Sequence, residues 1–456
     1  MKLEKLTLAN FRGFDQIDIE FSHDVTVIAG VNGVGKSGVL KAIASAMSLA
    51  LPKFTVSREA PIGLSDTDVQ SGKPGLSVAV MLGLDAAKVI VDLSHAAPLA
   101  ADKAESLLKR RDDLRFATRE LKKGSTEEQD INEEIRRIEI QLDQTSDIAA
   151  VRILPNDAAV ESDDLIAASK AGIQQPLAVF YSTSRFLSRL PPVLPKTKNI
   201  DSATAYDKSL SQLEVSLNDF ANWFRVVVAG AGSETRERLF QQLEQAVKTF
   251  LPEVSRLALH EGRPPRFSVM KSGRLLFLEQ LSDGERGLLA LVFDLVRRLA
   301  IANLDSRNPI AEGVALVLID EIELHLHPKW QRDVLPRLRD IFKACQFVVT
   351  THSPLVLGEV PARCVRFLEF IDDKVCATVP TEAYGMDANR ILQEFMGAPV
   401  RNRQVDTELT LLFELIDQEH FDEARAAIAN LAQKLGEDEP ELTRASSLIR
   451  FLEGAE

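Results

Sequence analysis

The chain has 456 residues and is 45% hydrophobic, enough for a sizeable core in one large domain or in two to three ordinary ones. Its formal net charge of −13 excludes a uniformly basic surface. It has no run of about 18 apolar residues, and its first residues lack the apolar core and cleavage site of a signal peptide. We therefore expect no membrane span and a cytoplasmic location.

The negative charge is concentrated near the end of the chain. From Val405 to Glu456 there are thirteen acidic and four basic residues, which contribute −9 and leave −4 for everything before them. The earlier part can therefore hold local basic patches, although solvated loop charges explain the same residues. The candidate patches are Arg256, Arg263, Arg266, Lys271 and Arg274, and Arg185, Arg189, Lys196 and Lys198.

Strands dominate the first part of the chain. Alternating apolar residues predict strands at 3–8 and 16–21, and the apolar run 25–30 leads into a glycine-rich turn and then a helix. A further hairpin is predicted at 76–93 and a buried strand at 177–182.

The segment 97–147 has a different character, because charge is dense and aromatic residues nearly vanish. Leucines recur at heptad spacing, and "KKGST" supplies a turn in which Ser125 or Thr126 can cap a second helix. The apolar positions are Leu107, Leu114 and Leu121 before the turn, and Ile131, Ile135, Ile138 and Leu142 after it. We predict an inserted antiparallel helical hairpin with arms of roughly 30 to 37 Å, either a plain surface feature or an interaction arm.

The second half of the chain mixes helices and apolar strands. Two amphipathic helices are predicted within 209–250, and a pair of short strands within 254–278. A helix follows residue 285, and the chain becomes helical again after residue 380. The remaining elements are an apolar strand at 314–321, a helix at 328–343 and a strand at 346–353.

The stretch "GVNGVGKS" matches the phosphate-binding loop and lies between a predicted strand and a predicted helix, as that motif requires. Glycines let backbone N–H groups converge on phosphates, Lys36 adds charge at the β and γ positions, and Ser37 offers a hydroxyl to magnesium. The sequence therefore predicts an ATP site with Mg²⁺. Its binding residues are Gly30, Asn32, Gly33, Val34, Gly35, Lys36, Ser37 and Gly38.

Two adjacent carboxylates, Asp320 and Glu321, follow a fully apolar strand. Burying both without a cation would be costly, which makes a purely structural role a weak explanation. We predict that Asp320 holds magnesium together with Ser37, and that Glu321 orients or deprotonates the attacking water.

His352 ends another apolar strand, in "FVVTTHSP". A histidine there is usually a structural residue when it occurs alone, but after the two preceding motifs it is a candidate γ-phosphate switch. The pair His325 and His327 is not expected to bind metal, because it lacks a nearby third ligand and Pro328 is typical of a first helical residue.

The stretch "LSDGE" lies before the strand that carries Asp320. Ser282 and Gly284 offer a hydroxyl and an unhindered N–H at a helix N-terminus, which favours anions. A helix cap alone could use Ser282 or Asp283 equally well. The carboxylate of Asp283 would repel a phosphate unless it points away or pairs with a cation such as Arg286, so we expect slow or partner-controlled turnover. The candidate nucleotide contacts are Ser282, Asp283, Gly284 and Glu285.

These motifs, in this order, resemble the ABC-type ATPase heads of the SMC, RecF and overcoming-lysogenization-defect group. The resemblance implies an α/β fold with a RecA-like mixed sheet, here with an inserted helical hairpin and a C-terminal helical appendage. It also implies a head-to-tail homodimer in which Ser282 and Gly284 act on the nucleotide of the opposite subunit. The expected parts are 1–95 and 149–400 for the head, 96–148 for the hairpin and 401–456 for the acidic helices.

A narrower similarity rests on 281–300, 318–340, 345–360 and 384–402. These stretches are similar to the ATPase subunits of Septu-type (PtuA-like) antiphage systems, some of them attached to retrons. That resemblance implies an ATP-hydrolysing subunit that senses or gates, and that controls a separately encoded HNH-type nuclease. A reverse transcriptase with its nucleic acid, or DNA, is a further partner in this family.

The resemblance also suggests two further site residues. The glutamine that contacts magnesium in this group follows the first helix, and Gln70 is the candidate. Arg12 matches the arginine of the group's N-terminal motif; it contacts either the nucleotide or a salt-bridge partner in its turn.

Two other functions compete with a defence role. One is a RecF- or SMC-like ATPase in DNA repair or chromosome maintenance; the other is a transporter-coupled ATPase, which needs neither the charged insertion nor the acidic helices. We expect no nuclease activity in the chain itself, because no HNH pattern occurs and only about 55 residues follow "GAPV".

Overall fold

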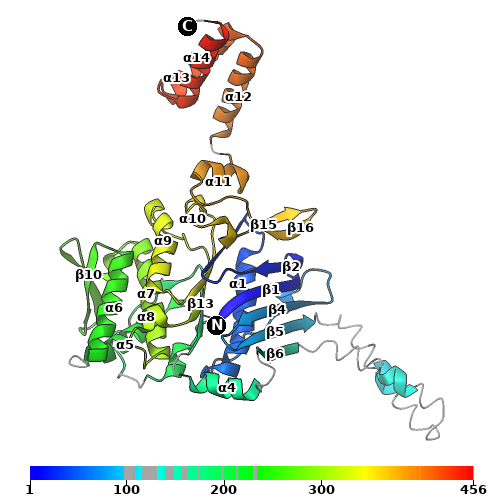
Figure 1. Ribbon diagram of the computed structural model, residues 1–456, viewed down its shortest axis with the longest axis vertical. Helices are drawn as coiled ribbons and strands as arrows, with labels where there is room; N and C mark the ends of the chain where they lie inside the picture. Colours follow the sequence, from blue (N-terminus) through cyan, green and yellow to red (C-terminus); the bar gives the residue numbers. More distant parts are fainter. Residues whose placement is uncertain are drawn as a thin grey trace. The chain divides into compact units, whose positions relative to one another are not determined.

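The computed structural model describes most of the chain (Figure 1). It describes residues 1–96, 106, 109–114, 131–136, 138, 148–156, 162–172, 175–196, 200–211, 214–229, 234–399 and 401–454. Two compact units result, Met1–Asp387 and Ala388–Glu456. Within these residues no helix combines the length and apolar character needed to cross a membrane.

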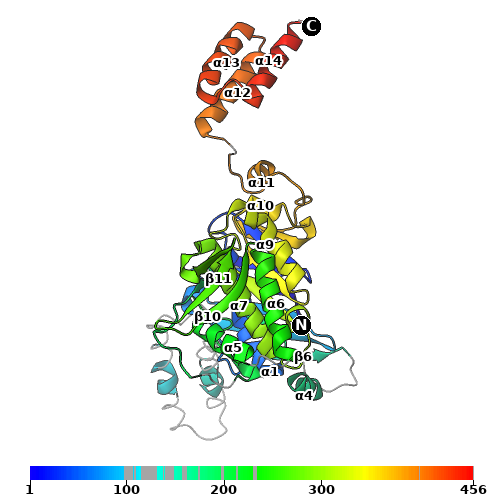
Figure 2. The same ribbon diagram turned by 90° about the vertical axis from the view of Figure 1, so that its left-hand side faces the viewer.

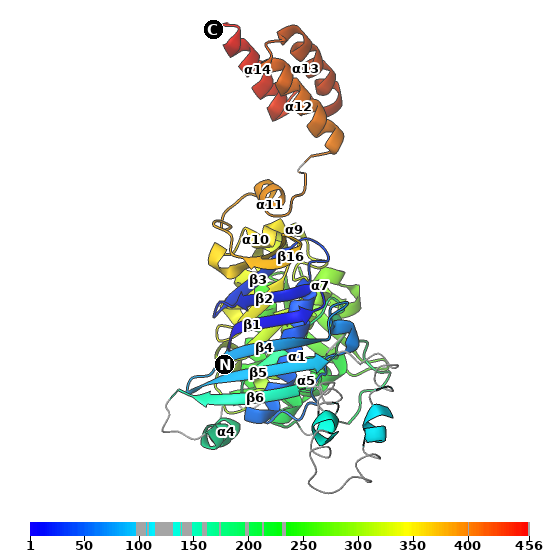
Figure 3. The ribbon, with the colours of Figure 1, turned by 90° about the vertical axis from the view of Figure 1, so that its right-hand side faces the viewer.

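One sheet of the larger unit is five-stranded and antiparallel, in the order β2-β1-β4-β5-β6 (Figure 3). Its strands are β1 (Lys2–Phe11), β2 (Phe14–Glu20), β4 (Gly75–Gly83), β5 (Ala87–Ala96) and β6 (Ile148–Pro155). Leu6, Leu8 and Ile19 are buried while their neighbours in sequence are partly exposed, so one face of the sheet is apolar. The predicted strands at 3–8 and 16–21 and the hairpin at 76–93 are confirmed.

The second sheet is six-stranded and mixed, in the order β16-β15-β3-β14-β13-β7. Its strands are β3 (Val25–Gly30), β7 (Leu177–Tyr181), β13 (Ala315–Ile319), β14 (Gln346–Thr350), β15 (Val365–Ile371) and β16 (Lys374–Thr378). All neighbours are parallel except the edge strand β16, and every residue of β3, β7, β13 and β14 is buried. Strands covered on both faces are apolar throughout, which explains the apolar runs in the sequence.

Helix α1 (Lys36–Phe54) packs against strands of both sheets (Figure 3). Fourteen of its 19 residues are buried, including the run from Ala42 to Ser48. It starts directly after β3, so its N-terminus is fixed at the carboxyl edge of the mixed sheet. The predicted α/β class with a mixed sheet is confirmed.

A helical layer with a small sheet completes the larger unit (Figure 2). It contains α5 (Leu217–Ala229), α6 (Glu234–Phe250), α7 (Asp283–Ala302), β10 (Val254–His260), β11 (Arg266–Lys271) and β12 (Arg274–Phe277). The prediction of two strands at 254–278 was wrong, because a tight turn at Ser272 and Gly273, with φ of 47° and 78°, separates β11 from β12. Phe220 and Phe293 stack with ring centroids 4.2 Å apart and join α5 to α7.

Helix α7 is also anchored by buried charges. Asp294 is 1% exposed; its carboxylate accepts hydrogen bonds from Arg297 (2.8 Å) and Arg298 (2.7 Å). The hydroxyl of Tyr181, the last residue of β7, donates to the same carboxylate at 3.1 Å. A buried carboxylate with these partners ties the helix to the sheet in one register.

The other α-helices and strands described in the larger unit are α4 (Ser162–Ala171), β8 (Phe186–Leu187), β9 (Glu214–Val215), α8 (Pro309–Glu312), α9 (Pro328–Ile341) and α10 (Pro354–Leu357). Most of the predicted hairpin at 97–147 lies outside the described residues. Its described parts, 109–114 and 131–136, are helical, and Arg110 donates to Glu134 at 2.6 Å.

The smaller unit consists of α11 (Ala388–Glu394), α12 (Arg403–Asp417), α13 (Phe421–Leu435) and α14 (Pro440–Leu452). The last three helices enclose their own apolar core, which includes Leu412, Ile416 and Leu431. The C-terminal helical appendage predicted from the sequence is confirmed. The unit begins at Ala388 rather than at 401, because α11 groups with it.

Candidate functional site: a phosphate loop facing the acidic end of a strand

The phosphate loop joins β3 to α1 and depends on glycine at two positions. Gly30 has φ +145°, and a side chain there would clash with the carbonyl oxygen of Leu368 in β15. Gly35 has φ +107°, and its Cβ would lie 2.5 Å from the ring of Phe14. The loop can therefore follow this path only with glycine at both positions. This path lets the backbone N–H groups at the start of α1 face a phosphate. Val34 is buried, so its side chain packs inward and only its backbone can face a phosphate.

Lys36 is the first residue of α1 and is 6% exposed. Its Nζ donates to the carbonyl oxygens of Gly30 (2.8 Å) and Val31 (2.9 Å), so the ammonium lies inside the curve of the loop. Burial lowers its pKa to about 8, against the opposing pull of Glu323, Asp320 and Glu321. A poorly hydrated cation among backbone N–H groups is suited to bind phosphate.

The structure brings Ser37 and Asp320 together although they are far apart in sequence. The hydroxyl of Ser37 donates to Oδ1 of Asp320 at 3.0 Å, and Thr350 Oγ1 donates to the same oxygen at 2.6 Å. The parallel strands β3, β14 and β13 place these residues at one edge of the sheet. A hydroxyl and a carboxylate are oxygen ligands that fit Mg²⁺, so Ser37 and Asp320 would hold it.

Glu321 and His352 follow the adjacent strands β13 and β14 by two residues, at the same edge of the sheet. The N–H of Glu321 donates to Thr350 Oγ1 at 2.8 Å. The N–H of His352 donates to Glu323, which also accepts from Thr351 Oγ1 at 2.7 Å. Burial lowers the pKa of His352, and the charge of Lys36 lowers it further, so the neutral imidazole is favoured near this cation. The predicted groups therefore gather around Lys36; their catalytic roles stay predictions.

The signature stretch begins α7 as a capping box. Ser282 Oγ accepts from the N–H of Glu285 at 3.4 Å, and the carboxylate of Glu285 accepts from Ser282 N (3.0 Å) and Oγ (2.8 Å). Lys271 of β11 holds Glu285 at 2.5 Å. A side chain at Gly284 would clash with the carbonyl oxygen of His325, so this glycine also permits close packing. The nucleotide contact of this stretch stays a prediction.

The carboxylate of Asp283 forms an ion pair with Arg286, as expected, and the arginine lowers the pKa of Asp283. The pair is exposed to solvent, so it offsets the charge of Asp283 only in part. We expect Asp283→Gly to raise the ATPase rate about fivefold by removing the remaining charge near the γ-phosphate. Asp283→Asn removes the same charge without adding a glycine to the helix, so it should raise the rate as well. Steady-state phosphate release measures both variants, and unchanged rates in both would contradict the tuning role of Asp283.

Arg12 lies beside the start of α1, and Gln70 lies in the neighbouring segment. Arg12 makes the salt bridge, with Nη2 2.6 Å from Asp68 Oδ1, and its Cδ lies 3.4 Å from the Cβ position of Gly38. Gln70 donates its N–H to Asn10, and its buried Oε1 has no hydrogen-bond partner among the described residues. An unpaired amide oxygen is compatible with the predicted metal contact, which stays a prediction.

Sequence reasoning missed three groups at this site: Arg185, Thr350 and Glu323. Arg185 was assigned to a candidate surface patch, but it is 8% exposed and donates to the backbone after β13. Thr350 and Glu323 lie within the motifs "VVTTHS" and "DEIELHLHP". Their place inside these motifs was the only indication in the sequence that they belong to the site. Pro328 is the first residue of α9, as the sequence predicted, and His327 caps that helix. Within the described residues no group of His, Cys, Asp and Glu could hold a metal by itself.

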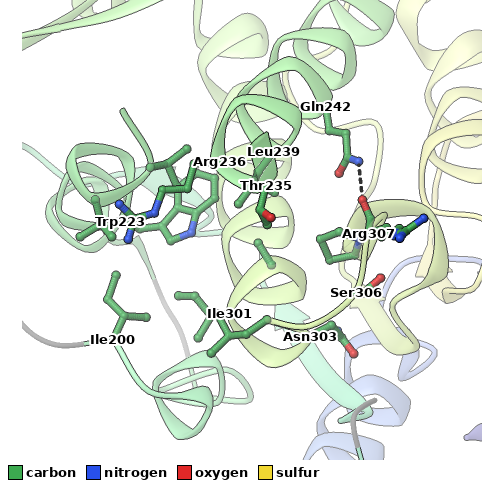
Figure 4. Close-up of a pocket in the computed structure, with 15 residues that line it drawn as sticks. Ile200, Trp223, Thr235, Arg236, Leu239, Gln242, Ile301, Asn303, Ser306 and Arg307 are labelled. Atoms are coloured by element: carbon green, nitrogen blue, oxygen red, sulfur yellow. Dashed lines mark hydrogen bonds between the residues drawn. The ribbon is translucent and has the colours of Figure 1, made fainter. Parts of the chain in front are cut away.

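A cavity of about 590 Å³ lies away from this site, at the C-terminal end of α7 (Figure 4). It is lined by Trp223, Leu239, Ile301 and ten other residues together with Arg236 and Arg307. None of the residues of the phosphate loop, β13 end or β14 end lines it. The cavity is therefore separate from the phosphate loop and the strand ends that face it.

A family model described as "AAA domain, putative AbiEii toxin, Type IV TA system" matches residues 25–358. The Retron Ec83 probable ATPase of Escherichia coli is 25% identical over 97% of this chain and 85% of its own length. The Retron Vc95 probable ATPase of Vibrio cholerae serotype O1 biovar El Tor is 35% identical over 40% of this chain and 34% of its own. The Septu protein PtuA of Bacillus mycoides (strain KBAB4) is 45% identical over 18% of this chain and 11% of its own.

Proposed function

The chain belongs to the family described as AAA domain, putative AbiEii toxin, Type IV TA system, and we propose that it is the ATP-hydrolysing subunit of an antiphage defence complex. The similarity to retron and Septu ATPases confirms the resemblance predicted from the motifs. One observation supports hydrolysis most directly: the 3.0 Å contact of Ser37 with Asp320, which joins the phosphate loop to the acidic strand end.

In this proposal each residue has a defined task. Lys36 and the loop N–H groups bind the phosphates of ATP, and Ser37 and Asp320 hold Mg²⁺. Glu321 orients or deprotonates the attacking water, and His352 donates a hydrogen bond to the γ-phosphate. Mg²⁺, when bound, offsets the charge that develops on the phosphate oxygens.

We propose that two copies form a head-to-tail dimer, each completing the other's site with Ser282 and Gly284. The capping box leaves the N-terminal N–H groups of α7 aligned, which suits a phosphate brought by a second copy. Turnover is slow, because the exposed ion pair with Arg286 offsets the charge of Asp283 only in part, and an uncharged residue there would favour the anion. ATP closes or holds this dimer, and hydrolysis changes its state.

The effector we propose is a separately encoded nuclease of the HNH type, with a reverse transcriptase and its nucleic acid, or DNA, as further partners. The support is the similarity to proteins named as retron and Septu components. The acidic unit Ala388–Glu456 is a candidate docking surface for a basic partner.

Expression of the chain with its neighbouring genes tests this function. We expect a nuclease to co-purify with the tagged chain, and phage plating to fall by at least about tenfold only when the ATP site is intact. The matched pair is Lys36→Ala, in the phosphate loop, and Lys41→Ala, an exposed lysine on the same helix. Removing residues 401–456 asks whether the nuclease docks there.

The outcome separates the proposed function from its nearest alternative. Unchanged phage plating together with increased sensitivity to DNA damage when the gene is deleted would favour a RecF- or SMC-like repair role. Equal protection by the Lys36→Ala and wild-type proteins would contradict an ATP-dependent defence function.

A further inference from the structure

A buried arginine lies behind the acidic end of β13. Arg185 follows β7, which pairs with β13 in parallel register from Leu177 and Ala315 to Tyr181 and Ile319. The N–H of Asp320 continues this pairing by donating to the carbonyl oxygen of Tyr181 at 2.8 Å. The loop after β7 is therefore held beside the loop after β13.

The guanidinium of Arg185 binds backbone carbonyl groups rather than a carboxylate. Nη1 donates to the carbonyl oxygen of Asp320 and Nη2 to that of Glu321, both at 2.6 Å. A longer contact of 3.5 Å reaches the carbonyl oxygen of Ile322. The planar fork thus spans consecutive peptide groups at the position of the proposed catalytic carboxylate.

The backbone at this position needs such support. Glu321 has φ +46°, a left-handed conformation that residues with a side chain rarely adopt because it strains the backbone. Thr350 Oγ1 accepts from its N–H, while Arg185 donates to its carbonyl oxygen. Contacts on both peptide groups therefore fix the direction in which the Glu321 side chain leaves the strand.

Charge supports the same arrangement. Burial lowers the pKa of Arg185, but Glu323, Asp320 and Glu321 oppose this effect, and arginine remains protonated in proteins. The guanidinium is thus a permanent cation next to three carboxylates, and it offsets their mutual repulsion whether or not nucleotide is present.

We propose that Arg185 is a positioning residue for ATP hydrolysis, which holds the backbone of Glu321 so that its carboxylate meets the attacking water. This inference rests on the proposed ATPase function. It predicts a selective loss of kcat, because phosphate binding depends on Lys36 and the loop, whereas Arg185 acts through Glu321.

The test is Arg185→Lys, which keeps the positive charge but replaces the planar guanidinium fork by a single ammonium that cannot reproduce its paired N–H contacts. We expect kcat to fall about 100-fold, with KM and the affinity for a fluorescent ATP analogue changed less than about threefold. The matched control is Arg337→Lys, because Arg337 also binds a backbone carbonyl, that of Phe250 at 2.7 Å, on α9. That control should retain the wild-type kcat.

A double-mutant cycle distinguishes positioning from general stability. If Arg185 acts through Glu321, Arg185→Lys will not lower further the residual rate of Glu321→Gln. A parallel loss of kcat and nucleotide affinity, an additive loss in the double variant or an unchanged kcat would each overturn the inference. Arg185→Gln, which keeps an N–H donor, replaces the lysine variant if thermal unfolding shows that the latter does not fold; failure of both to fold would mark Arg185 as purely structural.

The same measurements distinguish a failure of the proposed ATPase function from a failure of the role assigned to Arg185. A wild-type protein that hydrolyses ATP no faster than Glu321→Gln would refute the proposed function. A wild-type protein with normal turnover that is unaffected by Arg185→Lys would refute only the role of Arg185.

Discussion

Lys36→Ala is expected to weaken ATP binding by about 10- to 100-fold and to abolish measurable hydrolysis. Lys36 is 6% exposed, and its ammonium lies inside the loop, where it donates to the carbonyl oxygens of Gly30 and Val31. Replacement by alanine removes the cation that takes the place of water around a bound phosphate. The glycines that set the backbone path of the loop remain. Binding is measured by isothermal titration calorimetry with ATP and Mg²⁺.

The control for this variant is Lys41→Ala, which removes an exposed lysine one turn further along α1. It should bind ATP as the wild-type protein does, and both variants should unfold near the wild-type temperature. Wild-type affinity in Lys36→Ala would contradict the assignment of residues 30–37 as the phosphate loop.

Glu321→Gln is expected to lower kcat by at least about 100-fold while ATP affinity is retained. The glutamine keeps the size and the hydrogen-bonding oxygen of the side chain but cannot accept the proton of water. Its backbone contacts to Thr350 and Arg185 are unchanged, so the site should form as before. Single-turnover hydrolysis and nucleotide retention after gel filtration measure the two effects, and the variant should accumulate as an ATP-bound dimer.

Glu312→Gln is the matched control, because Glu312 is exposed on α8, just before the same strand β13. It should turn over ATP at the wild-type rate. Normal kcat in Glu321→Gln would remove this residue from the catalytic step, and Glu323, whose carboxylate is the strongest electrostatic partner of Lys36, would become the next candidate.

The two variants have distinct consequences for the proposed complex. Lys36→Ala tests whether the nucleotide is needed at all, whereas Glu321→Gln holds the ATP-bound state. If ATP binding is the signal, protection against phage will persist in Glu321→Gln and disappear in Lys36→Ala. If hydrolysis is the signal, protection will disappear in both.

Local patterns were sufficient for most elements of the head. The strand, glycine loop and helix around residues 25–54 are specified by residues close in sequence, because only glycine fits the backbone path of the loop at Gly30 and Gly35. The apolar runs at β13 and β14 predicted buried strands for the same reason. The sequence did not reveal the turn at Ser272 and Gly273, because a turn of only two residues hardly disturbs the pattern of residues typical of a strand.

The sequence by itself determined the types of group at the site: a phosphate loop, two carboxylates, a strand-end histidine and a capped signature helix. Only the tertiary structure decided which of them meet, since the order β3-β14-β13-β7 sets the neighbours and brings Ser37 to Asp320. It also showed that Arg185, which the sequence placed in a candidate basic patch, is buried and donates hydrogen bonds to the backbone at Asp320 and Glu321. The physical reason is that charge and periodicity are local properties, whereas burial and hydrogen bonding of an arginine depend on a strand pairing made across about 140 residues of chain.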